Sequence, residues 1–80
     1  MIIMMKDIEN FVNNRIGYAK NCPGNVNVFA AHAFGAVEFF ALALYNNNKA
    51  DREIELIEKW NEDWRQQFEN IHIEYINKGM

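Results

Sequence analysis

The stretch from residue 26 to 45 sets the organisation that we predict for the whole chain. Its sequence, VNVFAAHAFGAVEFFALALY, has only Asn27, His32 and Glu38 as polar residues. Apolar residues therefore point in every direction around a helical wheel, which is typical of a helix that is covered on all sides. We expect a central apolar helix near 26–45, with the segments before and after it as its cover.

The segment before this stretch is amphipathic. Its apolar residues recur at steps of three or four, and they are Ile8, Phe11, Val12, Ile16 and Ala19. This spacing predicts a helix from about 5 to 20. Pro23 and Gly24 follow it and predict a tight reversal of the chain. Either Asn25 or Asn27 is then placed to cap the central helix.

The segment after the central stretch predicts the longest helix, from about 49 to 77. One stripe of it alternates steps of three and four residues, and consists of Ile54, Ile57, Asn61, Trp64, Phe68, Ile71 and Tyr75. That spacing is typical of a heptad seam, in which a buried Asn61 would fix the helix register. Asn61 would face water instead if Trp60 took the core position, and the pattern leaves both alternatives open. With no strand pattern, we predict a single all-α domain over 1–80.

The length and composition of the chain indicate that one copy is too small to cover its own central helix. The chain has 80 residues, of which 50% are hydrophobic and 14% aromatic, which is a globular composition. A chain this short buries only about 60% of its unfolded surface on folding. Cys22 is the only cysteine, so an intrachain disulfide is excluded. We therefore predict a homodimer packed as a helical bundle.

Charge argues against two other classes of protein. The net charge is −3 and there is no basic stripe, so nucleic acid is not expected as the main ligand. The central stretch is long enough to cross a membrane, but an ionised Glu38 near its middle would cost at least a few kcal/mol in a bilayer. We therefore predict a soluble core helix. A lone cysteine fits a reducing compartment, and we expect a cytoplasmic protein.

One pair of residues has the spacing of metal ligands. Glu69 and His72 lie three positions apart in the last predicted helix. Carboxylate-bridged di-iron bundles use two such pairs together with one glutamate from each of two other helices. A symmetric dimer would supply that set if Glu38 is buried, with iron or another divalent transition metal as the cofactor. Because such a pair arises readily by chance in a Glu-rich helix, the pattern favours solvated side chains, and we otherwise expect no cofactor.

No catalytic or binding signature is present, and nothing near Cys22 in the sequence would activate it as a nucleophile. We therefore expect no catalysis. The sequence favours a small self-associating helical module, an adaptor or regulator that works by binding a protein. Aromatic residues are common interface anchors. The residues expected to serve here are Phe34, Phe39, Trp60, Trp64 and Phe68.

Overall fold

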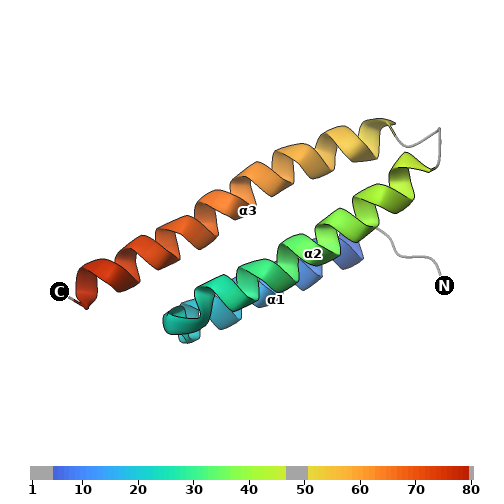
Figure 1. The fold of residues 1–80 in the computed structure, drawn as a ribbon. Coiled ribbons are helices and arrows are strands. Elements are labelled where there is room, and N and C mark those ends of the chain that lie inside the picture. Colours follow the sequence, from blue (N-terminus) through green and yellow to red (C-terminus); the bar gives the residue numbers. More distant parts are fainter. Residues whose placement is uncertain (1–4, 47–50, 80) are drawn as a thin grey trace.

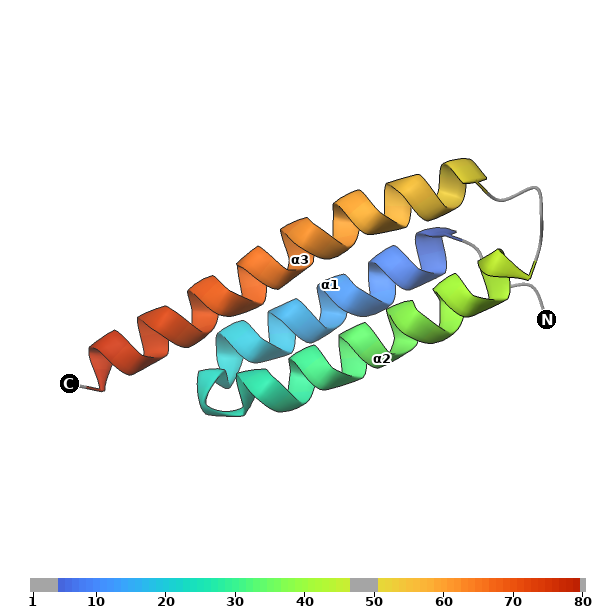
Figure 2. The ribbon, with the colours of Figure 1, turned by 45° about the horizontal axis from the view of Figure 1, so that its top comes forward.

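The computed structural model describes residues 5–46 and 51–79. These residues form three α-helices and a short 3₁₀ turn, without a strand: α1 (Met5–Asn21), η1 (Pro23–Asn25), α2 (Val26–Tyr45) and α3 (Asp51–Lys78). Helices α1 and α3 run in the same direction and α2 runs in the opposite one (Figures 1 and 2). The predicted all-α fold is thereby confirmed. The expected start of the last helix at residue 49 lies outside the described residues.

Helix α1 forms because its apolar residues fall on one face. Its buried residues are Ile8, Val12, Ile16 and Ala19. Asp7 in its first turn and Lys20 in its last turn each oppose the partial charge at that end of the helix dipole. On the flank of this face, the Arg15 guanidinium lies 4.6 Å from the centre of the Phe11 ring and 5.4 Å from that of Tyr18. Aromatic rings thus hold the only arginine of α1.

The reversal between α1 and α2 follows from Pro23. Cys22 has φ −131° and ψ 67°, outside the helical region, as expected for a residue that precedes proline. None of the described glycines has a positive φ, so the turn does not need Gly24 for a left-handed backbone conformation. Gly24 instead leaves room for the side chain of Tyr75. A Cβ atom on Gly24 would lie 3.3 Å from the hydroxyl oxygen of Tyr75, which packs against the turn. Asn25 directly precedes α2, but its side chain makes no capping hydrogen bond there.

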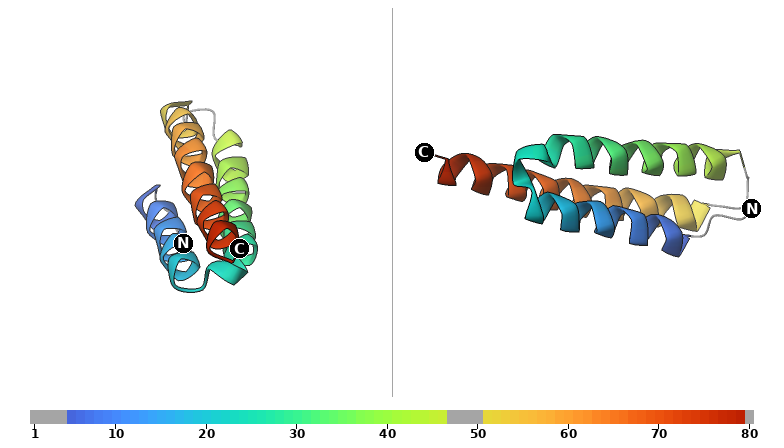
Figure 3. Two further views of the ribbon diagram at one scale, coloured as in Figure 1. Left: turned by 90° about the vertical axis from the view of Figure 1, so that its left-hand side faces the viewer. Right: turned by 90° about the horizontal axis from the view of Figure 1, so that it is seen from below.

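Helix α3 has 28 residues against the 20 of α2, so it is about 42 Å long against about 30 Å. Its last turns extend past the α1–α2 turn, as Figure 3 shows from below. Four of the seven predicted seam positions are buried, namely Ile57, Trp64, Phe68 and Ile71. Tyr75, the last of the seven, is 47% exposed. The heptad pattern therefore located the core face of α3 along its middle, and not at its C-terminal end.

The core lies where α2 meets both other helices. It combines the buried residues of α1 and α3 with Val26, Ala33, Val37 and Phe40 of α2. The ring centroids of Phe34 and Phe68 lie 5.6 Å apart in an edge-to-face arrangement that joins α2 to α3. The Cα atoms span 49 × 22 × 15 Å. A unit this elongated and thin leaves much of each helix facing outward.

Asn61 is a weak point in the packing between α3 and its neighbours. Its side chain is half-buried, and the amide oxygen Oδ1 is buried without a hydrogen-bond partner among the described residues. Neither sequence-based alternative describes it fully, since the amide lies at the boundary of the core rather than in its centre or in water. A buried polar atom left without a partner costs roughly 1–3 kcal/mol.

We therefore expect Asn61→Leu to raise the free energy of unfolding by about 1–2 kcal/mol, because it replaces the unpaired amide by an apolar side chain of similar shape. Urea denaturation followed by circular dichroism measures this change. Gln66→Leu is a suitable control, since Gln66 is exposed and its Nε2 atom donates to Asn70 Oδ1 on the helix surface. A lower stability of Asn61→Leu than of the parent protein would contradict the placement of Asn61.

Candidate functional site

The most conspicuous surface of the protomer is the side of α2 that points away from α1 and α3. Its four large apolar residues are well exposed, with Val28 at 51%, Phe39 at 70%, Leu42 at 61% and Tyr45 at 60%. We name this surface the outer face of α2. Between them along the helix lie the exposed residues Ala31, His32, Gly35 and Glu38, which we include in this face.

The outer face exists because α2 is apolar all round while only one side of it meets the other helices. Phe39 and Phe40 are neighbours in the sequence, and Phe40 is 5% exposed whereas Phe39 is 70% exposed. The 100° turn between consecutive helix positions places them on different sides. One protomer therefore does not cover the central helix, and the cover expected from the sequence is missing on this face.

Small residues in the middle of the outer face leave the α2 backbone open. An added Cβ atom on Gly35 would have no neighbour within 4 Å. Ala31, one helical turn earlier, is also exposed. Residues of this size allow a second helix to approach closely, as they do in tightly packed helix pairs.

The two ionisable residues of the outer face lie at its opposite edges. His32 and Glu38 are six positions apart, which corresponds to about 120° around the helix, so they do not pair within one protomer. Glu38 is exposed, so the burial that the metal alternative requires of it is not met within one protomer. Of the apolar residues beside it in the sequence, Val37 and Phe40 are buried and Phe39 is exposed.

The five residues expected as interface anchors occupy different places. Phe39 is largely exposed on the outer face, whereas Trp64 and Phe68 are each 4% exposed and belong to the protomer core. Phe34 and Trp60 are half-buried and pack against that core. The structure therefore places four of the five in or against the protomer core, and only Phe39 of the five is largely exposed.

The residues of the metal alternative do not form a site within one protomer. Glu69 is exposed and His72 is half-buried on α3, and Glu38 lies on the outer face of α2. Among the described residues, no group of three or more His, Cys, Asp or Glu side chains is arranged to hold a metal ion. A site built from two copies remains a prediction.

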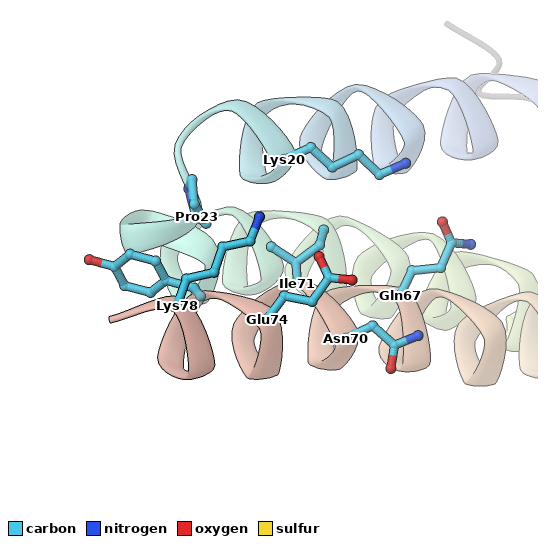
Figure 4. Close-up of a pocket in the computed structure, with 8 residues that line it drawn as sticks. Lys20, Pro23, Gln67, Asn70, Ile71, Glu74 and Lys78 are labelled. Atoms are coloured by element: carbon cyan, nitrogen blue, oxygen red, sulfur yellow. The ribbon is translucent and has the colours of Figure 1, made fainter. Parts of the chain in front are cut away.

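A second surface feature is a cleft between the end of α1 and the last turns of α3 (Figure 4). It has a volume of about 400 Å³ and is lined by Lys20, Pro23, Gln67, Asn70, Ile71, Glu74, Tyr75 and Lys78. All three of its charged residues are exposed to water. Sequence reasoning missed this cleft because it depends on α1 and α3 lying side by side in parallel, which no local pattern indicates.

Two further observations bear on the class of protein. The segment Pro23–Tyr45 is long and apolar enough to cross a membrane, judged by its length and composition alone. Within the protomer, 17% of its apolar stretch of 18 residues is buried. Comparison with protein-family models, with curated proteins and with solved structures finds no match for the chain.

Proposed function

We propose that this protein is a small helical interaction module that works as a homodimer, joined through the outer face of α2, and that it has no catalytic activity of its own. The observation that carries the proposal is the exposure of Phe39, Leu42 and Val28 on one side of a single helix. Contiguous exposed apolar surface is typical of protein–protein contacts.

Charge favours a second copy over a membrane surface as the cover. Helices that lie on membranes usually carry Lys or Arg beside their apolar face, which attracts anionic lipid headgroups. Helix α2 has neither residue, and the chain carries a net charge of −3. Two outer faces, by contrast, bring together surfaces on which Glu38 is the only acidic residue.

Sedimentation equilibrium over a wide range of protein concentrations tests the proposal. We expect a molecular mass of twice 9.4 kDa, with dissociation on dilution. A folded protein that keeps the monomer mass at the highest concentration would overturn the proposal. Flotation of such a monomer with neutral or anionic lipid vesicles would assign the outer face to a membrane instead.

A further inference from the structure

We propose that the second copy packs antiparallel on the outer face of α2, with the two helices crossing at Gly35. This inference rests on the proposed function, because it specifies how two copies meet. In this register, residues whose numbers add up to 70 lie at the same height, since a two-fold axis passes beside Gly35. Ala31 then lies level with Phe39 of the second copy, and Val28 with Leu42.

Gly35 suits the crossing point because nothing stands over it. A Cβ atom there would have no neighbour within 4 Å, so the backbone of α2 is exposed at this position. Residues on a two-fold axis face their own copy directly at the same height, which leaves the least room for side chains. Two glycines fulfil that requirement and permit the closest approach of the helices.

The order of sizes along the outer face favours the antiparallel direction. The small Ala31 precedes Gly35, and the large, 70% exposed Phe39 follows it. On the helical wheel Ala31 and Phe39 lie on either side of Gly35, about 40° from it in opposite directions. In an antiparallel pair, Phe39 of one copy is level with Ala31 of the other, so each end of the crossing receives one large and one small residue. The two Phe39 side chains lie on one edge of the interface and the two Ala31 on the other. Matching large with small residues at each height keeps the two helices equally far apart along their length.

A parallel pair lacks this balance. Ala31 would lie level with Ala31 and Phe39 with Phe39, so the helices would be too far apart at one end and crowded at the other. The ionisable residues do not oppose the antiparallel direction. The two copies of Glu38 would lie on one edge, separated by about 9 Å along the helix axis, where water screens their repulsion.

A pair of glycine substitutions tests the crossing point. Gly17 of α1 resembles Gly35, because it is exposed within a helix and an added Cβ atom would meet nothing within 4 Å. We expect both Gly17→Leu and Gly35→Leu to raise the urea midpoint of the protomer slightly, since glycine is a poor helix former. Only Gly35→Leu should raise the dissociation constant of the dimer, by at least tenfold. An unchanged dissociation constant for Gly35→Leu would overturn the crossing at Gly35.

Cross-linking tests the direction. In a Cys22→Ser background, Val28→Cys and Leu42→Cys are made separately, one of them with an isotope label, and a short bismaleimide is added to each alone and to the mixture. The antiparallel register places positions 28 and 42 of different copies side by side. It separates each position from its own copy by about 21 Å along the axis.

We expect cross-linked dimers in the mixture, with mass spectrometry locating the link between positions 28 and 42. Efficient cross-linking of each variant with itself would show a parallel pair and overturn the inference. A dimer by sedimentation equilibrium that gives no cross-link in any sample would overturn this docking geometry while leaving self-association intact. A monomeric mass for the parent protein would instead overturn the proposed function itself.

Discussion

Trp64→Ala is expected to lower the free energy of unfolding by about 3–5 kcal/mol, which is the usual cost of removing a buried large aromatic side chain. Trp64 is 4% exposed, so almost its whole indole lies in the core. Its ring centroid lies 5.6 Å from that of Trp60, which covers it from the preceding turn of α3. Alanine would leave a cavity that three helices in so thin a unit do not close.

The consequence is large because small domains have little stability to lose. At roughly 0.05–0.15 kcal/mol per residue, a domain of this size is stable by about 4–12 kcal/mol, so Trp64→Ala removes a large part of that free energy. Urea denaturation followed by circular dichroism measures the change. Trp60→Ala serves as the matched control, since Trp60 is half-buried and should cost clearly less. If Trp60→Ala proved the more damaging of the two, Trp64 would not lie at the centre of the core.

The helices themselves could be predicted because two of the three are amphipathic. The apolar residues Ile8, Val12, Ile16 and Ala19 face the core of α1 as their spacing indicates. Helix α1 ends at Asn21, one position beyond the predicted end. In such segments the contrast between apolar and polar positions indicates both the secondary structure and the side that is buried.

Helix α2 could be predicted as an element but not in its orientation. When every side of a helix is apolar, the sequence contains no signal for the side that faces the core. The choice is made by tertiary packing, which buries Val37 and Phe40 and leaves Phe39 and Leu42 exposed. For the same reason, the apolar surroundings of Glu38 in the sequence do not indicate whether its side chain is buried. The candidate site is thus the surface that sequence patterns describe least well.

The interface anchors illustrate the same limit. Aromatic residues stabilise cores and interfaces by the same burial of apolar surface, so their type does not distinguish the two roles. Trp64 and Phe68 fill the protomer core, and Phe39 lies outside it. The separation depends on which side of α2 meets the other two helices, and that is a property of the three-helix arrangement rather than of any one segment.

Phe39→Glu is expected to dissociate the dimer without unfolding the protomer. Phe39 is 70% exposed in the protomer, so a charged side chain at this position is hydrated there and costs little stability. In the proposed dimer it would lie in the interface, level with Ala31 of the second copy, where a carboxylate loses its water and finds no partner. Central aromatic anchors typically contribute at least about 2 kcal/mol, so the dissociation constant should rise by roughly 30-fold or more.

Two measurements separate loss of the dimer from loss of the fold. Sedimentation equilibrium gives the dissociation constant, and circular dichroism gives the helix content and the urea midpoint of the same variant. Leu56→Glu is the matched control, because Leu56 is an apolar residue of α3, 41% exposed, that lies outside the outer face of α2. We expect this control to keep the dissociation constant of the parent protein. If Phe39→Glu and Leu56→Glu dimerise equally well, the two copies meet through some other surface. The outer face of α2 would then be the contact surface for a different partner.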